Sequence, residues 1–283
     1  MDIKKNSCYN GNRKKYEDLT FLDDFMFCKV MRNPEICKRM LETILSIEID
    51  HIEYPQTQKS IDILADAKSI RMDVYVKGED QTVYNVEMQT TNTGELPKRS
   101  RYYQGLIDMD LIEKGEPYTE LNKSYVIFIC TFDPFKHGYP IYTFTNRCRE
   151  YDQVVLEDGT TKVFVNLTGM TDILTEGQKA LFEYLNNKLI TDIFTQLIES
   201  YISSAKSNME WRREFMTLDM KIQEECNKAL AIGKEEGRAE GEVEGARKKT
   251  IEFFKKLIDK GFSTDDAKSL SGISDEDAED CMR

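Results

Sequence analysis

The sequence contains few of the residues on which several enzyme classes depend. Only two of its 283 residues are histidine, His51 and His137. Serine–histidine and cysteine–histidine hydrolysis are not excluded, but general bases are scarce. None of the seven cysteines forms a C-x-x-C pair, so zinc ribbons and thioredoxin-type redox motifs have no support. An odd, scattered set of thiols favours a reducing cytoplasm over a disulfide framework. The cysteines are Cys8, Cys28, Cys37, Cys130, Cys148, Cys226 and Cys281.

Long apolar segments are also missing. The longest apolar run, residues 126–132, is far shorter than the roughly 20 residues that a membrane span requires. Residues 1–18 include basic side chains but lack the apolar segment of a signal peptide. We therefore expect a cytoplasmic protein that has no membrane partner.

An excess of positive charge is absent as well. The chain has 51 acidic and 39 basic side chains, a formal net charge of −12. This is the wrong sign for a protein that coats nucleic acid by bulk electrostatics. Any contact with DNA must come from a local basic patch or from bound metal ions. The abundance of carboxylates favours metal-assisted chemistry over histidine chemistry.

The order of the expected elements is that of an α/β domain. Apolar residues recur at helical spacing over residues 19–31, and Pro34 begins a second helix at a tolerated first-turn position. Alternating patterns over 69–76 and 82–89 predict a hairpin. The remaining expectations are a strand or extended connection at 47–54, a helix from about 98 to 114 that ends at Gly115, a buried strand at 124–132, strands at 139–146 and 161–167, and mainly helix from Gln178 onward.

Alternation brings three oxygen-bearing side chains to one face of the expected hairpin. Residues two apart in a strand share a face, so Glu87 and Gln89 point the same way. If the apolar faces of the two strands align, Asp73 joins them. Two carboxylates and a side-chain carbonyl oxygen suit Mg²⁺ or Mn²⁺, and such an ion assists phosphodiester hydrolysis. The alternative is that Asp73 and Glu87 are merely solvent-facing residues of an amphipathic hairpin.

Basic residues cluster just after this hairpin. Lys98, Arg99 and Arg101 fall in the first turns of the following helix, where they are candidates for contacts with phosphate oxygens. The alternative is a solvated helix face. A second basic group, near the N-terminus, fits a disordered tail better than a reader of DNA grooves. It comprises Lys4, Lys5, Arg13, Lys14 and Lys15.

Four segments together resemble the Rpn family of recombination-promoting nucleases and transposases, which belongs to the PD-(D/E)XK nuclease superfamily. They are LTFLDDFMFCKVM, RMDVYV, YNVEMQ and KRSRYYQGLIDMDLIEKGEPYTEL. The resemblance covers nearly the whole chain, including the glycine-rich IGKEEGRAEGEVEG. An E-M-Q strand followed by R-x-x-Y-Y is specific when D-V-Y-V stands upstream. The resemblance implies a restriction-endonuclease-like mixed sheet flanked by helices, with an α-helical C-terminal extension.

The resemblance also assigns roles at the hairpin. Asp73 corresponds to the first metal-binding aspartate, and residues 87–89 stand at the (D/E)-x-K motif. Gln89 departs from the superfamily's lysine, although E-x-Q is the form that the Rpn-like family shows. A lysine would supply positive charge to orient water and stabilise developing charge. Arg99, Arg101 or a second metal ion could compensate, and without compensation we expect slow cleavage.

A further metal ligand is implied on the first helix. Superfamily members often place a helix carboxylate near the metal, which makes Asp24 a candidate outer ligand. The alternative is that Asp24 is an exposed helix charge.

The C-terminal part combines glycines with charged residues. Gly233, Gly237, Gly241 and Gly245 recur every four residues, and each costs roughly 1 kcal/mol against alanine in a helix. Close approach of another helix would offset this cost, which predicts a homo-oligomer formed through the C-terminal helices. The charged residues between the glycines exclude a lipid-facing helix. The alternative is a flexible, partly frayed linker.

The last residues form a different unit. Ser263 and Ser274 are expected N-caps of two short helices. Residues 263–283 contain seven acidic side chains against Lys268 and Arg283, so we expect a protein contact here rather than DNA reading. The expected organisation is a basic arm at 1–16, a PD-(D/E)XK-like nuclease domain at 17–205, a glycine-striped helical segment at 206–261 and a short helical unit at 262–283.

The sequence thus predicts a Mg²⁺- or Mn²⁺-dependent DNA endonuclease that acts in recombination, transposition or defence against mobile DNA. The rival hypothesis is a catalytically weak or inactive nuclease fold that acts as an oligomeric DNA- or protein-binding module. The predicted site comprises Asp73, Glu87 and Gln89 as catalytic residues, Asp73, Glu87 and Asp24 as metal ligands, and Lys98, Arg99 and Arg101 as phosphate-binding residues.

Overall fold

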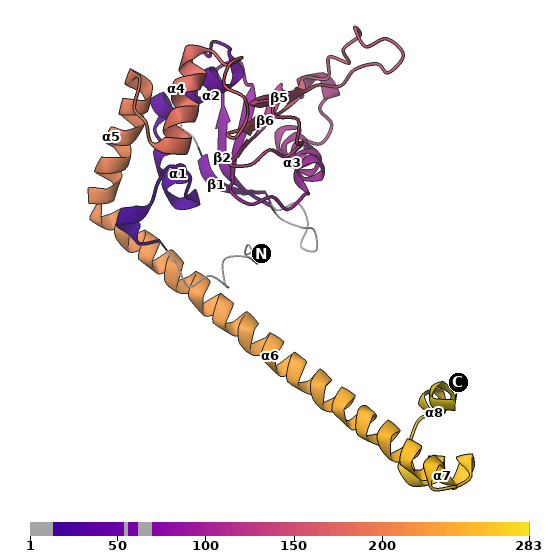
Figure 1. Ribbon diagram of the computed structural model, residues 1–283. Helices are drawn as coiled ribbons and strands as arrows, with labels where there is room; N and C mark the ends of the chain where they lie inside the picture. Colours follow the sequence, from indigo (N-terminus) through magenta and orange to yellow (C-terminus); the bar gives the residue numbers. More distant parts are fainter. Residues whose placement is uncertain (1–13, 54–55, 62–69, 283) are drawn as a thin grey trace. The chain divides into compact units, whose positions relative to one another are not determined.

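A six-stranded mixed sheet with helices on both sides organises the first part of the chain (Figure 1). The computed structural model describes residues 14–53, 56–61 and 70–282. The strand order is β1-β2-β3-β4-β6-β5, which confirms the predicted α/β class and mixed sheet. The strands are β1 (Gln56–Ile61), β2 (Ile70–Lys77), β3 (Val83–Gln89), β4 (Ser124–Cys130), β5 (Ile141–Phe144) and β6 (Thr160–Asn166).

The centre of the sheet is parallel. β3 pairs with β4 and β4 pairs with β6 in parallel, whereas β1–β2, β2–β3 and β5–β6 are antiparallel. A parallel pair needs a crossover connection, and α3 (Leu96–Leu111) supplies it between β3 and β4. The carboxyl ends of the parallel strands therefore meet at one edge. Here Thr131 N donates to Gln89 O at 3.0 Å, and Leu167 N donates to Cys130 O at 2.9 Å.

Helices cover the two faces of the sheet unequally (Figure 1). α3 contributes Leu96, Tyr103 and Ile107 to a buried cluster that includes Phe128 of β4. A group of four helices packs together elsewhere, and its first member contacts β1 and β2. These helices are α1 (Asp24–Met31), α2 (Pro34–Leu45), α4 (Glu176–Asn187) and α5 (Ile193–Ser207), with short 3-10 turns at Tyr16–Asp18 and Tyr118–Glu120.

Two element boundaries differ from the sequence prediction. The first helix begins at Asp24 rather than residue 19, because the Asp23 carboxylate accepts hydrogen bonds from Thr20 N at 2.7 Å and Thr20 Oγ1 at 2.9 Å and so stabilises a turn there. Residues 47–53 agree with the alternative of an extended connection, in which Ile52 makes an isolated β-bridge with Gly78. α3 ends at Leu111 rather than near Gly115, since Ile112 is already extended.

The chain divides into two compact units, one ending at Met216 and the other beginning at Thr217. The long helix α6 (Met209–Asp259) contributes to both. Its first turns are anchored to α1 by the buried Lys29, whose Nζ lies 2.6 Å from Glu214 Oε2 and 5.3 Å from the Trp211 ring centroid. This anchor makes residues 209–216 part of the sheet-containing unit.

The second unit has a small core of its own. α7 (Thr264–Ser271) and α8 (Asp275–Met282) pack on the end of α6 through a cluster that includes Phe254, Ala267 and Ala278. The predicted caps are confirmed, because Ser263 Oγ accepts from Asp266 N and Ser274 Oγ accepts from Asp277 N, both at 3.2 Å. Among the described helices, including the 51-residue α6, none has the length and apolarity that crossing a membrane requires.

Candidate active site

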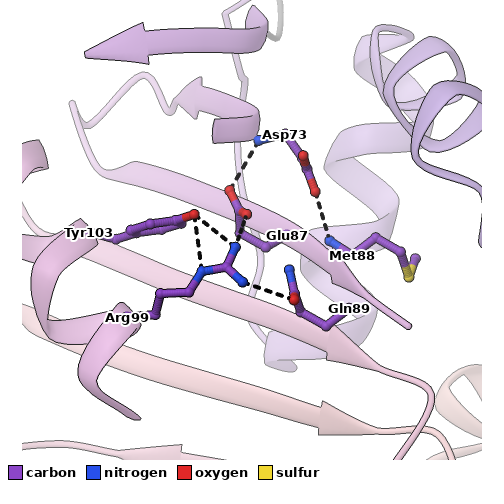
Figure 2. Close-up of polar contacts among 6 residues, drawn as sticks. All are labelled: Asp73, Glu87, Met88, Gln89, Arg99 and Tyr103. Carbon is purple, nitrogen blue, oxygen red and sulfur yellow. Dashed lines mark hydrogen bonds and ion pairs between the residues drawn. The ribbon is translucent and has the colours of Figure 1, made fainter. Parts of the chain in front are cut away.

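The candidate site lies where β2 and β3 part. The two strands are paired from Lys77↔Val83 to Val74↔Val86. Beyond that point β2 stays paired with β1, and β3 stays paired with β4. Side chains bridge the opening: Asp73 N donates to Glu87 Oε1, and Met88 N donates to Asp73 Oδ2, each at 3.1 Å (Figure 2). Asp73 and Glu87 are thus held against each other by the backbone of the opposite strand.

Glu87 is a buried carboxylate, with 1% of its surface exposed. Burial raises its pKa well above 4.5, and repulsion from Asp73 raises it further, while the Arg99 guanidinium, Asp73 N–H and the Asn85 amide act against this rise. The Asn85 side-chain nitrogen lies 3.3 Å from Glu87 Oε1 and 3.2 Å from Val74 O, as donor to both. For Glu87, the alternative of a merely solvent-facing hairpin residue is therefore wrong. α3 covers that face of β3, and β4 pairs alongside it within the sheet.

Arg99 enters the site from α3. Its Nη1 donates to Gln89 Oε1 at 3.0 Å, and its Nη2 lies 3.3 Å from Glu87 Oε2 (Figure 2). The Tyr103 hydroxyl accepts from both Arg99 Nε at 3.2 Å and Arg99 Nη2 at 2.8 Å. Burial and the nearby Glu87 carboxylate raise the pKa of Tyr103, so its hydroxyl keeps its proton. The sequence predicts that Asp73, Glu87 and Gln89 converge. The structure adds the cation of Arg99, which contacts Glu87 and Gln89.

The other predicted site residues lie on the two helices α3 and α1. Lys98 and Arg101 are exposed on α3, on either side of Arg99 in the sequence. Asp24 is exposed on the first turn of α1. One turn later, Cys28 Sγ donates to Asp73 O at 3.5 Å, so α1 adjoins the Asp73 strand. Within the described part of the chain, however, no three His, Cys, Asp or Glu side chains gather as a metal-binding group.

Two residues at the site were not identified from the sequence. Tyr103 follows Arg99 by four positions, a spacing that places both on one face of a helix, and this signal could have been used. Asn85 precedes Glu87 by two positions in β3, a spacing that places both on one face of the strand, but nothing in that spacing indicates contact with the carboxylate. Both residues contact the acidic centre rather than open solvent.

The donor set fits a hard divalent cation. Asp73 and Glu87 offer carboxylate oxygens and Gln89 an amide oxygen, the ligand type that Mg²⁺ and Mn²⁺ take in proteins. Mutual repulsion of the two carboxylates, which contributes to the raised pKa of Glu87, is relieved by a bound cation. Because two carboxylates meet there among the described residues, water would complete the coordination, as is usual for Mg²⁺.

Comparison with models of known protein families finds a match. The model described as "PD-(D/E)XK nuclease family transposase" matches residues 17–186. This segment contains the whole sheet and every residue of the candidate site. Comparisons with curated proteins and with solved structures give no match.

The raised pKa of Glu87 predicts a stability effect that depends on pH. A carboxyl group whose pKa is higher in the folded state stabilises the fold fully below its unfolded pKa, and this contribution is lost as pH rises through the folded pKa. In EDTA, we therefore expect Glu87→Gln to raise the free energy of unfolding at neutral pH, on the order of 1 kcal/mol, with a smaller gain near pH 4.5. Thermal or urea unfolding across this range measures the difference.

Glu42 provides a matched control with the opposite sign. Although burial acts to raise its pKa, hydrogen bonds from Lys38 and Ile49 N give a net lowering. This contribution is present above the unfolded pKa and is lost at acid pH. Glu42→Gln should therefore destabilise the protein at neutral pH. A Glu87→Gln variant that is less stable than the parent at neutral pH would contradict the electrostatic account of Glu87.

Proposed function

The chain belongs to the PD-(D/E)XK nuclease family of transposases, and from this premise we propose that it is a Mg²⁺- or Mn²⁺-dependent DNA endonuclease. We assign the activity to residues 17–205 and place it in the cytoplasm, in recombination, transposition or defence against mobile DNA. The observation that carries the proposal is the convergence of Asp73, Glu87 and Gln89 at the opening between β2 and β3.

The proposed roles follow from the position of each group. Asp73 and Glu87 would hold the ion, which when bound would polarise a phosphodiester and favour deprotonation of water. Gln89 has an amide group that can orient the attacking water by hydrogen bonding. Asp24 on α1 remains a proposed outer ligand.

Positive charge would come from α3. Arg99 is held beside Glu87 and Gln89, where a guanidinium can stabilise charge that develops on a phosphate. Lys98 and Arg101 are exposed on the same helix and would bind neighbouring phosphates, positioning the duplex without reading its sequence. With a net charge of −12 on the chain, such local contacts are the expected means of holding DNA.

The first prediction on activity concerns the carboxylates. Asp73→Asn and Glu87→Gln should each abolish Mg²⁺-dependent nicking of supercoiled plasmid, because neither amide can replace an anionic ligand. These isosteric changes are preferable to alanine, since both side chains also accept backbone hydrogen bonds. EDTA should stop the parent. Unchanged nicking by both variants would refute the proposed site, whereas a parent that is inactive but binds DNA would favour the non-catalytic alternative.

A second prediction concerns the residue that replaces the superfamily's lysine. If Gln89 orients water, Gln89→Ala should lower the cleavage rate by up to about 10-fold, because a hydrogen bond contributes about 0.5–1.5 kcal/mol. Gln89→Lys should retain or raise the rate, although its cation must share the space with Arg99, 3.0 Å from Gln89 Oε1. Plasmid cleavage at saturating Mg²⁺ measures both. Cleavage by Gln89→Ala at the parent rate would remove residue 89 from the mechanism.

We also propose that the C-terminal helices form a homo-oligomer. Residues 227–244 of α6 are all exposed, including the apolar Leu230, Ile232 and Val243. The four glycines of this region lie within continuous helix, where each costs roughly 1 kcal/mol against alanine. A second copy packed along this surface would offset that cost and cover the apolar side chains.

The glycines allow this assembly to be tested in the full chain. Apart from the adjacent turns of its own helix, a methyl group added at Gly233, Gly237, Gly241 or Gly245 meets no atom of the described residues within 4 Å. The quadruple glycine-to-alanine variant should therefore keep or gain helix content by circular dichroism, yet show a lower mass by light scattering because the added methyls obstruct a partner helix. It should also nick plasmid rather than linearise it. An unchanged oligomeric mass would refute close packing along the glycines.

A further inference from the structure

We propose that Arg99 is a built-in counter-ion of Glu87, held by Tyr103, which must leave the carboxylate before a divalent ion can bind there. This inference rests on the proposed metal-dependent function and deepens it. It makes Tyr103 a positioning residue that sets how readily the site accepts its cation, through Arg99 rather than through contact with the substrate.

The contacts of Arg99 place it where a cation is needed. Glu87 is buried, and a buried carboxylate requires a partner of opposite charge. In the described structure that partner is Arg99, whose Nη2 lies 3.3 Å from Glu87 Oε2. The guanidinium also lies 5.5 Å from the Phe128 ring centroid, which favours a cation over that ring. An ion that binds Glu87 Oε2 competes directly with this pairing.

Tyr103 is the residue that holds the guanidinium in place. It is 5% exposed, and its hydroxyl accepts from two Arg99 nitrogens at 2.8 and 3.2 Å. The ring packs in the core cluster beneath α3, so the hydroxyl is a fixed point rather than a mobile one. With Gln89 as a third contact at 3.0 Å, Arg99 can release Glu87 and still stay at the site.

Arg99 also retains the means to meet a phosphate. A guanidinium has five N–H donors, and the hydrogen bonds to Tyr103, Glu87 and Gln89 use four. One Nη1 N–H has no partner among the described residues, and 31% of the Arg99 side chain is exposed. Arg99 can therefore neutralise Glu87 in the ion-free protein and turn toward a phosphate oxygen once the carboxylate has another cation.

Titration of the full chain with Mn²⁺, without DNA, tests the inference by calorimetry. Arg99→Met removes the competing cation and should tighten Mn²⁺ binding about ten-fold, as expected for loss of a hydrogen-bonded charge. Tyr103→Phe keeps the charge but frees the guanidinium, and should tighten binding about three-fold. Arg39→Met is the control, because Arg39 also pairs with a glutamate, Glu35, and lies 5.5 Å from the Phe194 ring centroid; its affinity should equal the parent's.

The outcomes separate the two proposals. If Arg99→Met binds Mn²⁺ no more tightly than the parent, Arg99 is not a competing counter-ion and the inference is overturned. If only Tyr103→Phe is unchanged, net charge alone accounts for the effect, and the positioning role of Tyr103 is overturned. Absence of Mn²⁺ binding in the parent and in Arg99→Met alike overturns the proposed metal-dependent function together with the inference. Binding by Arg99→Met but not by the parent supports the inference in its strongest form.

Discussion

The separation of β2 from β3 beyond Val74 and Val86 is the constraint on which the site depends. Buried backbone N–H groups need acceptors, and where the strands part, the carboxylates of Asp73 and Glu87 supply them. The same oxygens that suit a divalent ion therefore also close the gap in the sheet. This double use fixes each carboxylate to the backbone of the opposite strand before any ligand arrives, which is the kind of preorganisation that catalysis requires.

The parallel β3–β4 pair explains where the positive charge comes from. A parallel connection must cross over the sheet, and α3 does so directly after the strand that carries Glu87 and Gln89. The first turns of α3 are thereby brought back over the end of β3. At this position the strand carries the neutral Gln89, and Arg99 contacts Gln89 Oε1 and Glu87 Oε2 from the helix. This topology therefore brings a positively charged side chain of α3 to the end of β3.

Much of this arrangement could be predicted from the sequence, because it depends on local periodicity. Alternation in two short strands was enough to predict that Asp73, Glu87 and Gln89 would converge, and the hairpin and the central strand β4 were identified correctly. Burial of Glu87 could not be predicted in the same way. It depends on α3 packing over the face of β3 that carries Glu87, a tertiary contact that no spacing within residues 82–89 encodes. The late start of α1 depends likewise on one hydrogen-bonded turn between Thr20 and Asp23.

The acidic character of the chain determines what kind of nucleic-acid contact the site can make. A net charge of −12 works against long-range attraction of DNA, and α7 and α8 add acidic side chains in a separate unit. Screening limits such repulsion to about 10 Å at moderate salt, so a short basic stretch can still act at close range. Lys98, Arg99 and Arg101 form that stretch beside two carboxylates whose charge a divalent ion would cancel. Because the ion would turn the centre from repulsive to attractive for phosphate, metal binding and DNA binding are expected to favour each other at this site.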